Sequence, residues 1–301
     1  MSRKTGLVIW LAGWTLGGTV PTPALGAPQS QDRAQREWRN SPHAGSMDTP
    51  DERERMNRAG CAHCHTAQGY HEMTLAGLAS SAPYSDPVGL TCLACHAPGE
   101  APDDAGPLRA GAPRKACLGC HDELVSNTPD DLSWCSQEGV FNGTGGAEIP
   151  GLDYSVATHA GLEDGCVTCH MAPAAPGLDP GALGGHTFRV KTKGESPILF
   201  NPGPCQPCHG EMTLESVTAS QEEVQGLLAD LAGLLPQKPV LDEPAATEPR
   251  YPSDPSLGEI QARASYNYWL IQKDGSLGVH NPIYTRALLE HSIAELRARS
   301  H

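Results

Sequence analysis

One short pattern occurs five times in this chain: two cysteines with two residues between them, followed directly by a histidine. The copies are CAHCH, CLACH, CLGCH, CVTCH and CQPCH, and they begin at Cys61, Cys92, Cys117, Cys166 and Cys205. Ten of the 11 cysteines belong to these copies. Whatever the five copies hold therefore constrains the fold more than any other feature of the sequence.

Three kinds of site use cysteine pairs: disulfides, zinc sites and covalently attached haem. A disulfide framework needs no histidine after each pair, and a zinc site needs four ligands. Haem uses the whole pattern, because the two sulfurs form thioethers to the porphyrin and the histidine coordinates the iron. The sequence therefore predicts five covalently bound c-type haems. They would be attached through Cys61, Cys64, Cys92, Cys95, Cys117, Cys120, Cys166, Cys169, Cys205 and Cys208, with His65, His96, His121, His170 and His209 as proximal iron ligands.

Each haem iron has a second axial position, and a neutral imidazole is a usual ligand there. Eight histidines lie outside the proximal positions. Of these, His63 lies inside a motif, His301 ends the sequence, and His291 is predicted on the exposed face of a helix. Five histidines remain, which is also the number of predicted haem irons. We predict these as distal ligands: His43, His71, His159, His186 and His280.

The amino-acid composition does not favour a large core of apolar side chains. Aromatic residues make up 5% of the chain, and 33 glycines and 27 prolines favour turns over long regular elements. We predict a mainly α fold with much irregular structure, typical of a multihaem cytochrome c. Stacked porphyrins would replace the missing apolar core, and C-terminal helices would pack on them.

The sequence divides into three predicted regions. In residues 1–27, Arg3 and Lys4 precede a short apolar run with small residues after it, as in a secretory signal peptide, although an uncleaved anchor is the alternative. This predicts a periplasmic or extracellular protein with no transmembrane span after cleavage. Residues 28–210 carry all five motifs, and residues 211–301 form a helical region in one domain with them.

The apolar periodicity of the last region predicts three helices. The first covers residues 214–235, a proline-rich linker follows, and the second covers residues 257–272. The third begins after His280, with Asn281 as its cap and Pro282 in its first turn. Their apolar stripes would pack inside the monomer, or else form the interface of an oligomer. The lone Cys135 is expected to be a buried thiol, with a haem contact or a bridge to a partner as alternatives.

Several segments resemble a known family. THAGLEDGCVTCHMAP, GGHTFRV, CQPCHGEMTLESV and the segment ASYNYWLIQKDGSLGVHNPIY are similar to the C-terminal half of pentahaem cytochrome c nitrite reductase, and EWRNSPHAGSM resembles an opening distal-ligand segment. Octahaem hydroxylamine oxidoreductases and tetrathionate reductases share parts of this likeness. The resemblance implies that His186 and His280 are distal ligands, and that His159 either lies at an active site or coordinates another iron.

Three departures from that family favour an electron carrier over an enzyme. The first motif ends in His65, where the family's catalytic haem usually has lysine. The segment after the third motif, HDELVSNTPDDLSW, lacks the expected tyrosine, and no arginine clearly matches the catalytic one. An enzyme needs an open iron and placed proton donors.

The formal charge of −14 argues against a nucleic-acid partner, which would need a surplus of lysine and arginine. We therefore predict an exported pentahaem cytochrome that carries electrons through bis-histidine haems between a redox donor and acceptor, such as a membrane quinol-oxidising complex. One alternative is a reductase of nitrite, hydroxylamine or a sulfur oxyanion, with one open haem and His159 as proton donor. Another is a subunit of a haem filament or of a complex in anaerobic respiration.

Overall fold

The structure is a computed structural model that describes residues 31–98, 105–109, 111–121, 137–194, 196–236 and 258–299. The predicted signal peptide, most of the predicted linker, Cys135 and His301 lie outside these residues. All five motifs and all five predicted distal histidines lie within them.

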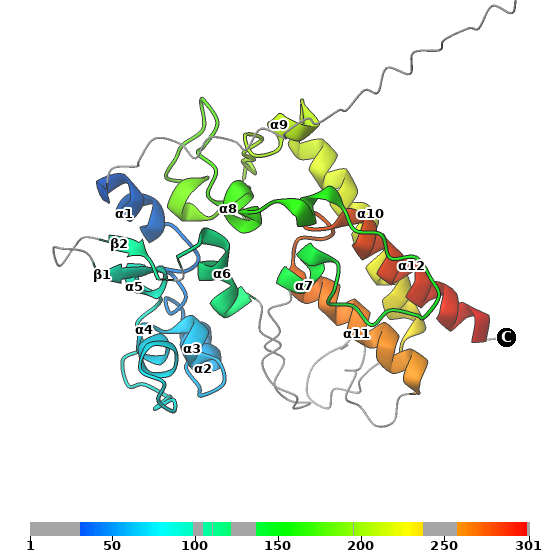
Figure 1. Ribbon diagram of the computed structural model, residues 1–301, viewed down its shortest axis with the longest axis horizontal. Helices are drawn as coiled ribbons and strands as arrows, with labels where there is room; N and C mark the ends of the chain where they lie inside the picture. The colour runs from blue at the N-terminus through cyan, green and yellow to red at the C-terminus, as the bar shows by residue number, and fades with distance from the viewer. Residues whose placement is uncertain are drawn as a thin grey trace, which may run out of the picture.

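The first part of the chain consists of short elements joined by irregular segments (Figure 1). In chain order they are α1 (Gln31–Arg39), α2 (Pro50–Met56), α3 (Ala62–His65), α4 (Ala67–Gly69), a π-helix (Tyr70–Leu75), α5 (Cys92–Cys95), β1 (His96–Pro98), β2 (Ala105–Leu108) and α6 (Pro113–His121). Thr49 begins α2 with a capping box, in which its side chain accepts from the backbone N–H of Glu52.

The middle of the chain continues in the same manner. It contains α7 (Gln137–Asn142), a 3-10 turn (Thr158–Gly161), α8 (Gly165–His170), a second 3-10 turn (Gly185–Thr187) and α9 (Gln206–His209). Each of the five motifs overlaps one of the helices α3, α5, α6, α8 and α9.

Three longer helices end the described chain: α10 (Leu214–Leu234), α11 (Glu259–Asp274) and α12 (Pro282–Arg299). They match the predicted helices to within two residues at each boundary that was predicted. The side chain of Asn281 accepts a hydrogen bond from the backbone N–H of Tyr284 at 3.3 Å, so the predicted cap of α12 is also confirmed.

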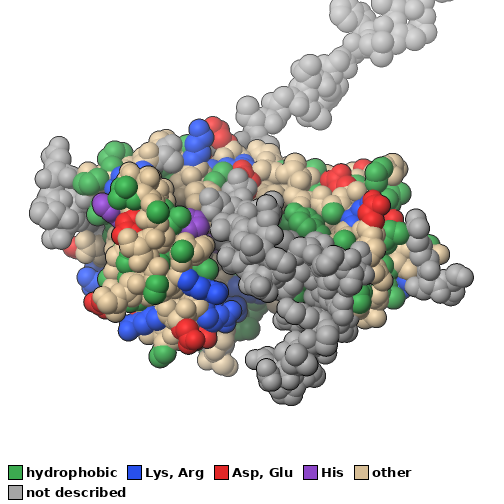
Figure 2. Space-filling model, turned by 90° about the horizontal axis from the view of Figure 1, so that it is seen from below, with side chains coloured by type: hydrophobic (Ala, Val, Ile, Leu, Met, Phe, Trp, Pro, Cys, Tyr) green, Lys and Arg blue, Asp and Glu red, His purple; other side chains and the backbone are tan. Residues whose placement is uncertain are grey.

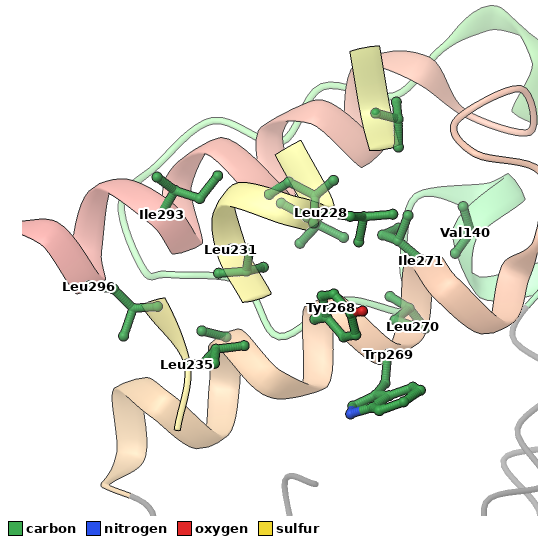
Figure 3. Close-up of a cluster of buried hydrophobic side chains, with 14 of the residues drawn as sticks. Val140, Leu228, Leu231, Leu235, Tyr268, Trp269, Leu270, Ile271, Ile293 and Leu296 are labelled. Carbon is green, nitrogen blue, oxygen red and sulfur yellow. The ribbon is translucent and has the colours of Figure 1, made fainter. Parts of the chain in front are cut away.

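The main apolar core lies between these three helices and α7 (Figure 3). Each fully buried leucine or isoleucine contributes about 1.5–3 kcal/mol relative to an exposed one. Leu289, Ile293 and Leu296 of α12 are all buried here. The core therefore comes from within this chain, which is the first of the two uses expected for the apolar stripes.

The motif-bearing part has no comparable core. Its large buried apolar side chains are few among the described residues, and they include Met47, Leu90, Val167 and Leu183. The mainly helical fold with much irregular chain is confirmed. The small antiparallel hairpin of β1 and β2 was not expected, and its two strands are too short to show an alternating pattern. In the described part of the chain, none of the helices is long and apolar enough to cross a membrane.

Candidate haem sites

Five sites are defined here by their motifs: site 1 (61–65), site 2 (92–96), site 3 (117–121), site 4 (166–170) and site 5 (205–209). One helical turn separates the two cysteines of each site, which puts both sulfurs on the same side of the short helix. None of the ten motif cysteines forms a disulfide within the described residues, so all ten sulfurs remain for thioether bonds. The donor set of each site therefore fits two thioether bonds and one axial imidazole.

Four proximal histidines face a second histidine. His43 pairs with His121 at site 3, His186 with His96 at site 2, His280 with His170 at site 4, and His159 with His209 at site 5. In the same order the ring centroids are 6.1, 6.4, 6.1 and 5.9 Å apart, and the ring planes meet at 88°, 33°, 63° and 78°.

These separations suit an iron between the two rings. Two metal–nitrogen bonds of roughly 2 Å place the coordinating nitrogens about 4 Å apart, and the ring centroids lie farther out than those nitrogens. Each pair joins segments that are distant in the sequence, so local chain geometry does not impose the spacing. The four pairs are therefore the strongest fit to axial ligation that the described residues offer.

Hydrogen bonds at Nδ1 leave Nε2 of several rings available. Nδ1 of His96 lies 2.8 Å from the carbonyl oxygen of Gly106, and Nδ1 of His159 lies 3.0 Å from that of Val279. A carbonyl oxygen only accepts, so Nδ1 carries the proton in these contacts and Nε2 has a free lone pair. This is the tautomer that coordinates a metal through Nε2.

The axial pair of site 3 is half-buried. Burial, together with the neighbouring His121, lowers the pKa of His43 to about 4. The Nδ1 atom of His43 is buried without a hydrogen-bond partner. Burial also lowers the pKa of His121, although its hydrogen bond with Gln137 opposes the shift. Both rings are therefore neutral at pH 7, which is the form that binds iron.

Carboxylates approach two of the distal histidines. At site 4, Nδ1 of His280 lies 2.6 Å from Oδ1 of Asp274, whose side chain is fully buried. Burial lowers the pKa of His280, but the Asp274 contact outweighs it and the net shift is upward. At site 2, Nδ1 of His186 lies 3.8 Å from Oε2 of Glu37, which also accepts from the His186 backbone N–H at 3.0 Å.

Site 1 differs from the other four. Burial lowers the pKa of His65, with His63 and His121 nearby, but no axial pair forms at site 1 within the described ranges. The predicted distal ligand His71 is exposed on the π-helix, where it lines a cavity of about 380 Å³ together with Tyr70 and Arg109. The structure thus pairs four of the five predicted distal histidines, and the role of His71 stays a prediction.

The expectation for His291 was wrong. It is half-buried, and its ring packs edge-on against Tyr154 with centroids 4.9 Å apart. A helical position alone could not reveal this, because the segment that carries Tyr154 reaches α12 only in the folded chain. His63 likewise has a buried Nδ1 atom.

The sites adjoin one another around site 3. Helices α6 and α8 contact each other, and the closeness of the Cys117 and Cys166 thiols lowers the pKa of Cys166 to about 6 and raises that of Cys117, so site 3 adjoins site 4. Burial, together with the nearby thiols of Cys205 and Cys208, raises the pKa of the Cys169 thiol to about 11, so site 5 is next to site 4.

Site 2 joins the same group of sites. Burial raises the pKa of Cys95, and the thiol of Cys120 adds to the shift, so site 2 also adjoins site 3. Site 1 approaches it too, since His121 contributes to the pKa shift of His65. The described residues therefore place sites 1 and 2 beside site 3, with sites 4 and 5 following.

Three residues near the sites were not found from the sequence. Phe188 packs its ring edge-on against His43, with centroids 4.7 Å apart, and against His186 at 6.1 Å. The other two are the carboxylates Glu37 and Asp274. Their only sequence signal is that Phe188 lies two residues after His186 and Asp274 lies six before His280, which is too general to be predictive.

Within the residues described here, no group of three or more histidine, cysteine, aspartate or glutamate side chains is arranged to hold a metal ion.

Comparisons with known proteins support a cytochrome. Residues 86–126, which hold sites 2 and 3, match the family described as Doubled CXXCH motif. No curated protein matches the chain.

Two solved structures share the fold. The outer cell wall cytochrome OcwA has a TM-score of 0.54 and 23% identity, over 86% of this chain and 49% of its own. The undecahaem cytochrome from the S-layer of Carboxydothermus ferrireducens has a TM-score of 0.52 and 20% identity, over 86% of this chain and 40% of its own. The chain thus spans about half the length of these structures or less.

The family match, the cytochrome fold and the repeated motif support covalently bound c-type haem and a multihaem cytochrome. They do not single out the nitrite reductase or hydroxylamine oxidoreductase group that the sequence resembles.

Proposed function

We propose that this chain is an exported cytochrome that holds five c-type haems and carries electrons between a redox donor and a redox acceptor. The observation that carries the proposal is the set of four histidine pairs, whose ring centroids are 5.9–6.4 Å apart. An iron with two histidine ligands has no open position for a substrate, and it exchanges electrons without changing its ligands.

The residues of the chain would hold each haem and adjust its potential. The motif cysteines bind the porphyrin, and the two imidazoles of a pair complete the coordination. The carbonyls of Gly106, Val279 and Phe188 hold ring tautomers in place through Nδ1. A bound haem supplies the one-electron chemistry.

The adjacency of the sites supports a route for electrons. Sites 1 and 2 adjoin site 3, and sites 4 and 5 follow it. Site 5 is the most open end of this series, because Cys208 and His209 are exposed on α9, whereas the histidines of the pairs at sites 3 and 4 are half-buried. We propose that a partner exchanges electrons at site 5.

The surface charge bears on the choice of partner. The chain has a formal charge of −14, yet lysine and arginine side chains gather over one end of the face drawn in Figure 2. The solved structures that share the fold are named for an outer cell wall and an S-layer, which supports a location in the cell envelope or outside the cell. The donor and acceptor would then be other exported or membrane-bound redox proteins.

A second candidate function is favoured by site 1. His65 has no ring partner among the described residues, which is what one open haem in a reductase would require. Arg53, Arg55 and Arg58 lie just before this site in the chain, and an anionic substrate would be attracted to them. This candidate does not use His159 as proton donor, because the ring of His159 faces that of His209.

Electron paramagnetic resonance of the purified ferric protein tests both candidates. The proposed carrier requires low-spin signals from at least the four paired sites. If nitrite or hydroxylamine converts a remaining high-spin signal at site 1 and is turned over with a reductant, the reductase is supported. Predominantly high-spin haem would contradict the pairing on which the carrier rests.

A further inference from the structure

A buried carboxylate lies behind the distal histidine of site 4. The Asp274 side chain has no exposed surface, and its Oδ1 atom lies 2.6 Å from Nδ1 of His280. Its Oδ2 atom accepts from the backbone N–H of Ser276 at 3.1 Å and from the Ser276 hydroxyl. The carboxylate is therefore held in place at the end of α11, against the ring whose other side faces His170.

Among the described residues, the distal histidines of sites 2, 3 and 5 have no equivalent negative charge. His159 meets the neutral carbonyl of Val279, and the Nδ1 atom of His43 is buried with no partner. Glu37 stays 3.8 Å from Nδ1 of His186 and forms an ion pair with Arg33 at 2.6 Å. In the ranges that the structure describes, no arginine or lysine forms an ion pair with Asp274.

We propose that Asp274 is a positioning residue that makes site 4 the lowest-potential haem among the four paired sites. The inference rests on the proposed function. A carboxylate that accepts the Nδ1 proton increases the basicity of Nε2, and a basic ligand stabilises ferric over ferrous iron. The buried negative charge acts in the same direction, because a low-dielectric surrounding strengthens its interaction with the charge on the iron.

The consequence concerns the order of electron transfer. Site 4 lies between site 3 and the exposed site 5. Because its potential would be low, electron transfer into site 4 from either neighbour would be thermodynamically unfavourable. The residues of site 4 would hold a haem that supplies one-electron exchange with its neighbours, without any bond forming or breaking. Electrons would then reside on either side of site 4 rather than on it.

Two substitutions in the haem-loaded protein test the proposal with opposite signs. Asp274→Asn keeps an oxygen that accepts from Nδ1 but removes the charge, so the midpoint potential of site 4 should rise. Ser276→Ala removes a hydroxyl that hydrogen-bonds the carboxylate and makes that carboxylate more basic, so the same potential should fall. Potentiometric titration followed by paramagnetic resonance resolves the individual haems.

Matched variants separate charge from structure. Asp274→Glu should restore a potential close to that of the unaltered protein, because it restores the charge. Glu37→Gln at site 2 should shift its haem by less than Asp274→Asn shifts site 4, because Glu37 is farther from the ring and paired with Arg33. A merely structural role for Asp274 would leave the potential of Asp274→Asn unchanged while the unfolding midpoint fell.

The outcomes distinguish a failure of the role of Asp274 from a failure of the proposed function. Opposite shifts confined to one low-spin haem support the proposal. If site 4 stays low-spin but neither variant moves its potential, or if all haems move equally, the role of Asp274 is overturned and the electron carrier stands. If the unaltered protein lacks low-spin haem, the proposed function and this inference both fail.

Discussion

The carbonyl oxygen of Phe188 lies 3.0 Å from Nδ1 of His170, so the backbone of Phe188 holds the proximal ligand of site 4. The ring of the same residue packs against His43 of site 3 and His186 of site 2. One residue thus contacts the ligands of three sites. Its φ of 57° lies in the left-handed region, which costs roughly 1–2 kcal/mol for a residue with a side chain.

Replacing Phe188 should reveal both roles. Phe188→Ala removes the ring packing and should destabilise the holoprotein by about 2–4 kcal/mol, since the ring is half-buried. Phe188→Gly should be at least as stable as Phe188→Ala, because glycine adopts the positive φ without strain. Urea unfolding followed by far-UV circular dichroism measures both. A glycine variant clearly less stable than the alanine variant would contradict the strained backbone.

Substitution of His43 tests the axial pair of site 3. His43→Met should keep the iron six-coordinate and raise its potential, because methionine ligation raises haem potentials. His43→Ala should instead convert one haem to a high-spin form. Magnetic circular dichroism and potentiometry detect these changes, and a spectrum unaltered in both variants would show that His43 does not coordinate.

Whether the haem iron of site 1 has a second axial ligand depends on His71. Because His71 is exposed and lies in no axial pair, we expect a high-spin fraction in the unaltered protein that His71→Ala leaves unchanged. The ferric electronic spectrum of the two proteins measures this fraction. If a high-spin signal appears only after the substitution, His71 is the distal ligand of site 1, as the count of histidines predicted.

The helical core should matter for stability independently of the haem ligands. Leu231 and Ile271 are fully buried between the C-terminal helices, so changing either to alanine should cost about 2–5 kcal/mol. Glu222→Ala, on the exposed face of α10, should change the stability by no more than about 0.5 kcal/mol. Chemical denaturation of the haem-loaded protein compares them. Equal effects would place the main core elsewhere.

The sequence predicted the elements whose signal is local. Each motif is contained in a few residues, and the apolar periods of α10, α11 and α12 follow from the helical repeat. The pairing of distal histidines depends on how distant segments meet: His43 comes from before α2 and His280 from the turn before α12. The same is true of Asp274 and Phe188, because their roles arise from contacts that sequence spacing does not encode.

The count of histidines did not distinguish half-buried positions from exposed ones. His43, His159, His186 and His280 lie opposite proximal ligands, because each is fixed by neighbouring structure. His71 sits on an exposed π-helix, where nothing in the described residues directs it toward an iron. Counting alone could not separate this case from the others.

Both the proposed function and the role of Asp274 require porphyrin to be attached covalently to the chain, and the motifs predict five attachment sites. The most direct measurement is the intact mass of the protein purified from a host that exports it and matures c-type cytochromes. The account predicts the polypeptide mass plus five haem groups, with all ten motif cysteines resistant to thiol alkylation. A mass equal to the polypeptide alone, with those ten cysteines reactive, would contradict it.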